Sequence, residues 1–440
     1  MIARRLVLVG AAALFAARGA LARGRSITGG RVSLRVPWPV ATVDPHRIDD
    51  GTAAIFGEAL FDTLYAVEGA AIVPALAEGD PEVDGANVRV RLRAGLRTGR
   101  ERLFGTKDAI AAVARSRGMG GRGWLADVPV PRDEGGKALL FATKDAGKLA
   151  RALASPIVAM VPNGFTPDAP DGTGPFRFSL RDGAMILTRN PLAARGPSFL
   201  DEVVVRPAAD VSASLLAFEA GSDDIGWFER GLHEPRPGSK SFDHGVVGWA
   251  ALFTGRDAND WDGPGIAQRI SDGIPYARLS SLHLGAAWSP EPEQGWGGPA
   301  SSILVREDAT WLVAIANALA ASLTRPRHEV TVKTVPAAEL AARRASRMFG
   351  LVLDVVRSIA PGSLGALVSL ATADNPTRAQ DIMQHAPKLG DVPARMLTRT
   401  LRVGIVGEIR VGGGRTPELQ LAPSQTGASF DLGASSRTRR

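Results

Sequence analysis

The sequence contains no cysteine and only six histidines among its 440 residues. Disulfide bonds, thiolate metal ligands, cysteine nucleophiles and lipid attachment through a cysteine are therefore excluded. The histidines lie far apart, and none has a partner at the spacing of a metal-binding motif. The sequence therefore predicts neither a metal site nor a bound cofactor.

Long apolar runs are also missing, because no stretch after the first residues reaches about 18 uninterrupted apolar residues. The first 22 residues are predicted to be an export signal, with Arg4 and Arg5 before the apolar run 6–17 and the small-x-small cleavage site Ala20-Leu21-Ala22. The two arginines permit twin-arginine export as well as the general secretory route. Without a cysteine for a lipid anchor, we expect a mature protein free in a bacterial periplasm.

An excess of charge in one region is not found either. The formal net charge is +7, but 52 basic residues face 45 acidic ones along the whole chain. Such mixing is typical of a solvated surface, whereas a nucleic-acid site needs a concentrated basic patch. We therefore expect no nucleic-acid partner.

Catalytic motifs are incomplete wherever they begin. The stretch GMGGRG at 118–123 matches a dinucleotide fingerprint in letters, but it follows a helical pattern where that motif needs a strand. The glycines of DGTGPF, 171–176, are followed by no Gly-Lys-Ser/Thr, so a phosphate loop is excluded. Ser363 lacks the glycine two places before it that a nucleophile elbow requires. The sequence therefore does not predict an enzyme.

Strand and helix patterns alternate along the chain. Alternating apolar residues predict strands at 31–36 and 88–92, and the run 202–227 predicts a strand, a helix at about 211–220 and a second, parallel strand. The same alternation is predicted again by a helix at about 307–323 and by a strand, a helix and a strand over 328–356. Two separated β-α-β regions predict an α/β protein with two sheets, joined by a crossing and irregular loops within 230–299.

A family resemblance begins in the segment 43–78, which contains Asp44-Pro45-His46, Phe61-Asp62-Thr63-Leu64 and Pro74-Ala75-Leu76-Ala77. These motifs resemble, in order and spacing, the opening of the bacterial extracellular solute-binding proteins of family 5, the oligopeptide, dipeptide and nickel receptors of ABC importers. The later GTGPF corner and the runs 186–190, 196–206 and 215–225 are similar to further motifs of that family. The resemblance covers Val43 to Trp227 well and Trp311 to Val356 moderately.

The resemblance implies a two-lobed periplasmic binding protein of type II, in the large peptide-binding subclass, with a hinge and an interlobe cleft. The implied boundaries are a signal peptide at 1–22, lobe I at 23–245 with a small inserted subdomain at about 50–165, lobe II at 246–401, and a return to lobe I with a basic tail at 402–440. It also implies a monomer that binds a peptide or other small solute and delivers it to the permease and ATPase subunits of an importer. Backbone pairing with the ligand as an added strand is expected to give affinity. The predicted ligand contacts are His46, Asp49, Asp50, Trp249, Arg357 and Ser358.

One departure concerns the ligand itself. The strand of the second lobe normally runs into Trp-x-x-Asp, whose carboxylate binds the α-amino group of a peptide. This chain reads LDVVRSIAPGS from Leu353, with Ile359 at the position expected for the carboxylate. Arg357 suggests a carboxylate or another anion instead. A degenerate receptor that acts as a sensor or accessory envelope protein is therefore the alternative function.

Overall fold

The computed structural model describes residues 29–227, 238–274, 296–386, 389–425 and 429–438. The predicted signal peptide lies outside these ranges. None of the helices within them has both the length and the apolar composition needed to span a bilayer.

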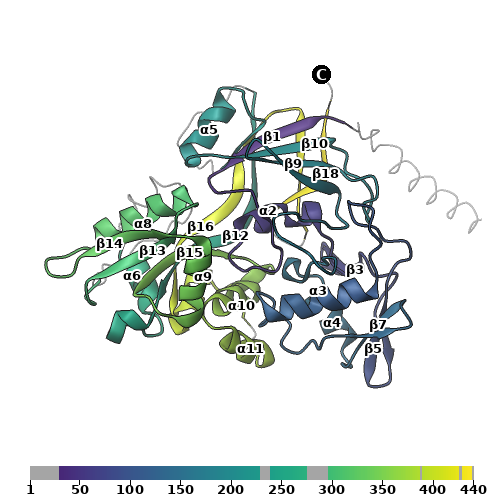
Figure 1. Ribbon diagram of the computed structural model, residues 1–440, viewed down its shortest axis with the longest axis horizontal. Coiled ribbons are helices and arrows are strands. Elements are labelled where there is room, and N and C mark those ends of the chain that lie inside the picture. The colour runs from purple at the N-terminus through teal and green to yellow at the C-terminus, as the bar shows by residue number, and fades with distance from the viewer. Residues whose placement is uncertain (1–28, 228–237, 275–295, 387–388, 426–428, 439–440) are drawn as a thin grey trace, which may run out of the picture.

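One large mixed sheet organises the described chain (Figure 1). Its ten strands lie in the order β14 (Val330–Val335), β13 (Ser301–Arg306), β15 (Leu351–Arg357), β12 (Lys240–Thr254), β16 (Val403–Arg415), β11 (Ile225–Trp227), β1 (Arg31–Val36), β10 (Glu202–Pro207), β9 (Ala184–Arg189) and β8 (Phe176–Arg181). Smaller sheets pair β2 (Tyr65–Glu68) with β3 (Ala71–Pro74) and β17 (Leu419–Pro423) with β18 (Phe430–Arg437), and join β4 (Glu82–Asp84), β5 (Asn87–Arg91), β7 (Ala138–Phe141) and β6 (Arg132–Glu134).

The helices pack around these sheets. The α-helices are α2 (Gly51–Leu60), α3 (Thr106–Gly118), α4 (Ala146–Ala152), α5 (Val211–Glu219), α6 (Ile266–Asp272), α8 (Thr310–Leu323), α9 (Ala337–Ser346), α10 (Gly362–Asp374), α11 (Pro376–Gln384) and α12 (Ala394–Leu397). Short 3₁₀ turns span Pro156–Val158, Arg256–Trp261 and Thr398–Thr400. We call the part built on β1 and β8–β11, with the segment 37–175, the first lobe. The part built on β13–β15 with α8–α11 is the second lobe (Figure 1).

Both predicted β-α-β units are present, and in each of them a strand from elsewhere in the chain lies between the two strands of the unit. β10 and β11 are parallel, as predicted, but β1 lies between them and pairs with both. In the second lobe β13 lies in the same way between β14 and β15. The alternating pattern of β1, with Val32, Leu34 and Val36 almost fully buried, gives this strand its central place.

The prediction of two separate sheets is wrong, because β12 and β16 join both lobes into one sheet. These antiparallel strands pair over most of their length, from Lys240 with Arg415 to Phe253 with Val403. β15 pairs with the other edge of β12, and β11 with the other edge of β16. Sequence periodicity misses β12 because Val247 to Thr254 are buried on both faces of the strand and therefore do not alternate. In the first half, register shifts at Asp243/Gly245 and Val246/Gly248 disturb the pairing.

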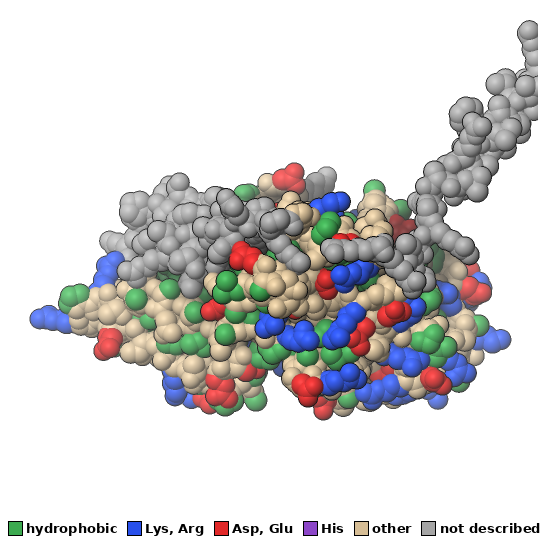
Figure 2. Space-filling model, turned by 90° about the horizontal axis from the view of Figure 1, so that it is seen from above, with side chains coloured by type: hydrophobic (Ala, Val, Ile, Leu, Met, Phe, Trp, Pro, Cys, Tyr) green, Lys and Arg blue, Asp and Glu red, His purple; other side chains and the backbone are tan. Residues whose placement is uncertain are grey.

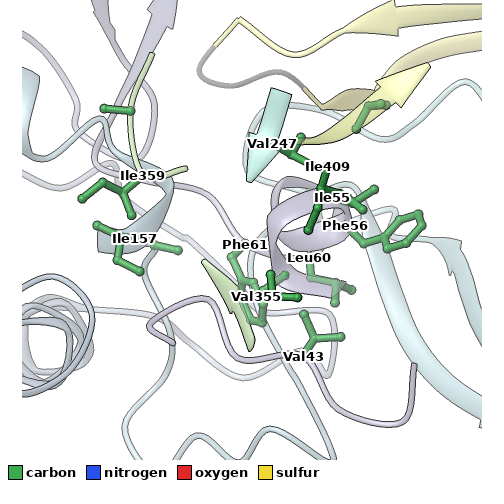
Figure 3. Packing of buried hydrophobic residues seen from close by; sticks show 14 of the residues in the cluster. Val43, Ile55, Phe56, Leu60, Phe61, Ile157, Val247, Val355, Ile359 and Ile409 are labelled. Carbon is green, nitrogen blue, oxygen red and sulfur yellow. The ribbon is translucent and has the colours of Figure 1, made fainter. Parts of the chain in front are cut away.

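The core continues from the sheet into α2, which lies where the two lobes meet. Figure 3 shows Val247 of β12 and Ile409 of β16 against Ile55 of α2. Because helix α2 also contacts β8, β15 and β18, it joins elements that lie far apart in the sequence. Its position fixes the segment before it, residues 44–50, at the boundary between the lobes.

Candidate functional site

A cavity of about 500 Å³ lies between the two lobes. Part of its wall follows the carboxyl ends of three strands with parallel neighbours: Trp38 and Pro39 come after β1, Asp308 and Trp311 after β13, and Ala337 and Ala338 after β14. Asp354 and Val355 line it from within β15. Ligands of open α/β sheets bind at such carboxyl ends, where the loops diverge. We call this space the interlobe cavity.

Two tryptophans that line the interlobe cavity contact each other beside it. The ring centroids of Trp38, from the first lobe, and Trp311, from the second, lie 6.0 Å apart with the planes tilted by 53°. Next to them, the hydroxyl of Thr310 donates a hydrogen bond to the carbonyl of Ala209 at 2.6 Å. These contacts hold the lobes together beside the cavity and give it an aromatic wall.

The charged groups of the interlobe cavity are arranged in pairs. Arg47 donates two hydrogen bonds to Asp49, at 2.9 and 2.6 Å, and Arg306 binds Asp308 in the same bidentate way. Burial alone would raise the pKa of Asp49, but the hydrogen bonds and charge of Arg47 lower it to about 2. Asp49 is therefore ionised at neutral pH, and its pair with Arg47 forms a polar part of the wall.

Asp50 lines the same cavity and has a structural task as well. It caps α2 by accepting a hydrogen bond from the Ala53 N–H at 2.7 Å, and it accepts a second one from the Asp44 N–H at 2.8 Å. Burial raises its pKa to about 6, although both hydrogen bonds oppose the rise. Asp44 itself holds the Arg115 guanidinium through two hydrogen bonds of 2.8 and 2.7 Å.

His46 is placed differently from its predicted neighbours. Its side chain is fully buried and lines none of the cavities described here. The ring Nε2 lies 2.8 Å from the carbonyl oxygen of Ala159, which defines it as the protonated nitrogen. Burial lowers the pKa of His46 to about 4, so the ring is neutral at pH 7.

The remaining predicted residues, Trp249, Arg357 and Ser358, surround a second cavity of about 250 Å³. It shares no lining residue with the interlobe cavity. We call it the Arg357 cavity. The six predicted contacts therefore fall into three places: Asp49 and Asp50 in one cavity, these three residues in another, and His46 in the core.

The two predicted contact segments touch each other directly. The Arg357 N–H donates to the carbonyl of Ile48 at 2.8 Å, and the Arg357 Nη1 donates to the carbonyl of Pro45 at 3.2 Å. An added ligand strand between residues 46–50 and the end of β15 would need these same backbone groups. Residues 45–48 and Arg357 therefore already occupy each other's backbone groups, and the open volume lies in the interlobe cavity and in the Arg357 cavity.

Ile359 lies in an apolar environment. It is fully buried, and Figure 3 shows it beside Ile157. The Ser155 hydroxyl donates to its carbonyl oxygen at 2.5 Å. The position expected for the carboxylate that binds a peptide amino group is thus part of the core.

Sequence reasoning missed Trp38, Trp311 and Arg306 as candidate site residues. All three sit at or just after the carboxyl end of a strand, and that position was the available signal. It could be used only once strand order was known, because β1 and β13 lie far apart in the sequence and on opposite sides of β12 and β16.

The glycines of GMGGRG serve close packing. A Cβ at Gly120 would lie 2.7 Å from the His46 carbonyl oxygen, and one at Gly123 would lie 2.4 Å from the Ala379 Cβ in the second lobe. The motif follows α3 directly, as the sequence predicted when it excluded a dinucleotide loop.

Comparison with known proteins identifies the fold. No protein-family model and no curated protein matches the chain by sequence. Among solved structures, it is similar to AgaA from A. tumefaciens R10 in complex with agropinic acid, with a TM-score of 0.70 and 14% identity over 93% of this chain and 99% of that one. It is also similar to the oligopeptide-binding protein AppA from Bacillus subtilis in complex with a nonapeptide, with a TM-score of 0.68 and 13% identity over 94% and 100% of the two chains.

A third similar structure is the periplasmic binding protein DppA from Helicobacter pylori in complex with the peptide STSA, with a TM-score of 0.68 and 15% identity over 94% and 99% of the two chains. The chain therefore has the fold of two-lobed periplasmic binding proteins. The resemblance to family 5 solute-binding proteins is confirmed at the level of the fold.

Proposed function

We propose that this protein is the periplasmic substrate-binding component of an ABC importer. It binds a peptide or peptide-like small solute between its lobes and, as a monomer, delivers it to a membrane permease coupled to an ATPase. The supporting observation is the interlobe cavity of about 500 Å³, enclosed by loops from both lobes and by Trp38 and Trp311. This volume is within the range of about 300–1,000 Å³ that small-molecule sites occupy.

The binding site is tested by filling the cavity from an exposed position. Ala338 lies at the start of α9, is exposed and lines the cavity, so Ala338→Trp should occupy the space at little cost to the fold. Ala345→Trp is the matched control, because it is exposed on the same helix and does not line the cavity. We expect the first variant to lose solute binding and the second to keep it.

The measurement is a thermal-shift screen of residues 23–440 with di- to pentapeptides, amino-blocked peptides, nickel chelates and small anions. A solute at one hundred times its dissociation constant adds about 2.7 kcal/mol of stability, which such a screen detects. A solute that stabilises the Ala338→Trp variant as well as the control contradicts binding in this cavity. Transport is tested separately, by asking whether cells without the gene stop taking up that solute.

The alternative function is that of a sensor or accessory envelope protein without transport. The Arg357 N–H to Ile48 carbonyl hydrogen bond favours it, since it closes the place where a peptide backbone would be added as a strand. Absence of any stabilising solute in the screen, together with unchanged uptake in cells without the gene, is the result expected of such a protein.

A further inference from the structure

The Arg357 cavity carries a buried cation without an ionic partner. The Arg357 side chain is 2% exposed, and no described residue forms an ion pair with it. Its Nε has no hydrogen-bond partner within the described chain, and its Nη1 reaches the Pro45 carbonyl at 3.2 Å. A buried guanidinium that lacks a counter-charge is costly, because burial removes its hydration.

The nearest acidic groups are engaged elsewhere. Asp44 holds Arg115, and Asp50 accepts the hydrogen bonds that cap α2. Glu58, which also lines the cavity, accepts the Ser424 hydroxyl at 2.7 and 2.8 Å. These carboxylates act on Arg357 through their charge but form no ion pair with it, so a direct anionic contact can still be made by a group that enters the cavity.

A helix N-terminus faces the same cavity. Gly362, the first residue of the 13-residue helix α10, lines it together with Ala360, Pro361 and Ala366. Pro361 occupies the N-cap position, where it offers no side-chain acceptor to the first-turn N–H groups. These N–H groups and the helix dipole favour an anion at this end of the helix.

Beside Arg357, the wall combines the polar residues Glu58, Ser358 and Ser429 with apolar side chains. The apolar part includes Trp249 and Val247 of β12 together with Ala54 and Ala366. An adjoining cavity of about 260 Å³, which Arg357 also lines, contains Asp62 and Asp431 as well as Glu58 and Arg195. Arg357 and Glu58 line both cavities, and the two further carboxylates, Asp62 and Asp431, make the adjoining cavity less favourable for an anion than the Arg357 cavity.

We propose that the Arg357 cavity binds the carboxylate of a small organic acid with a short apolar tail. Arg357 and the first-turn N–H groups of α10 bind the carboxylate, while Trp249 and Val247 contact the tail. A volume of about 250 Å³ is below the range of sites for drug-sized ligands, which indicates a small acid. The site is separate from the interlobe cavity and does not depend on the proposed transport function.

Calorimetry of the mature chain tests this with acetate, propionate and butyrate against the alkylammonium ions of equal length. The carboxylates should bind, and each added methylene should tighten binding about fourfold. The ammonium ions and the amidated acids should not bind. The Ala338→Trp variant should bind the acids as wild type does, so failure of the proposed solute site leaves this result unchanged. Equal binding of acids and ammonium ions, or no binding of the acids, overturns the proposal.

Arg357→Met and Arg357→Lys locate the site. The first should weaken acid binding at least about tenfold, and the second less, because it keeps the charge. Without acid, Arg357→Met should be as stable as wild type or more stable, since an apolar side chain replaces an uncompensated buried charge. Unchanged acid binding by this variant overturns the proposal. If the variant does not fold, Ala54→Met, which fills the cavity from α2, decides instead: retained binding contradicts the site, and lost binding supports it.

Discussion

Gly172→Ala is expected to lower the free energy of unfolding by about 3 kcal/mol, because the added methyl group has no room. A Cβ at this position would lie 2.2 Å from the Leu60 carbonyl oxygen and 2.6 Å from the Phe61 ring. The carbonyl cannot move away without loss of the hydrogen bond that it accepts from the Gly174 N–H at 3.0 Å. Urea denaturation at pH 7 measures the change.

Gly57→Ala is the matched control, because Gly57 lies in α2, the helix whose end Gly172 contacts. No heavy atom outside its own chain neighbours and its helix backbone lies within 4 Å of a Cβ at Gly57, and the residue is inside α2. Alanine is a better helix former than glycine by up to about 1 kcal/mol, so this variant should be as stable as wild type or slightly more stable. A loss below about 1 kcal/mol for Gly172→Ala, or equal losses for both variants, would show that the corner does not pack against α2.

The structure explains why a rigid corner stands at this place. The Thr173 hydroxyl donates to Asp62 at 2.8 Å, and the Asn190 side chain donates to the Gly174 carbonyl at 2.9 Å. The corner therefore connects the end of α2 to the start of β8, whose Phe176 is buried in the core. Turn chemistry and alternation are local properties, so a corner and a strand of this kind can be predicted from the sequence alone.

The large sheet could not be predicted from local patterns. Each β-α-β unit was visible, since a strand, a helix and a strand follow one another within about thirty residues. The insertion of β1 between β10 and β11, and of β12 and β16 between the lobes, depends on pairing between segments about 100 or more residues apart. β12 also lacks a local pattern, because its second half is buried on both faces and its first half contains register shifts.

The candidate site shows the same division. Residues 44–50 were recognised through a contiguous motif, and the structure places them at the boundary between the lobes. The ring centroids of Trp38 and Trp311 lie 6.0 Å apart although 273 positions separate the two residues in the sequence. No rule of sequence spacing predicts such a contact. Figure 2 shows, on the face that it presents, basic and acidic side chains interspersed, in agreement with the mixed charge along the sequence.

Because His46 is kept neutral in the folded protein, we expect the free energy of unfolding to fall as the pH is lowered from 6.5 to 4. Its pKa is about 4 in the folded chain and about 6.5 when it is exposed, so the unfolded state binds the proton first. The contribution is complete above pH 6.5 and is lost progressively below it, and the shift corresponds to about 3 kcal/mol. Asp50 opposes this trend, because its pKa is raised to about 6 and its ionised form lowers stability as the pH rises.

The pH dependences of His46 and Asp50 have opposite signs and partly cancel, so the prediction is tested in the Asp50→Asn background. Asparagine keeps an acceptor for the Ala53 N–H but loses the one for the Asp44 N–H. Because asparagine does not titrate, this loss of stability does not change with pH. In that background the free energy of unfolding should fall steeply between pH 6.5 and 4. Adding His46→Gln, whose amide N–H can still donate to the Ala159 carbonyl, should remove about 3 kcal/mol of that fall. Parallel pH profiles for the single and double variants would show that His46 titrates normally and is therefore not held neutral in the core.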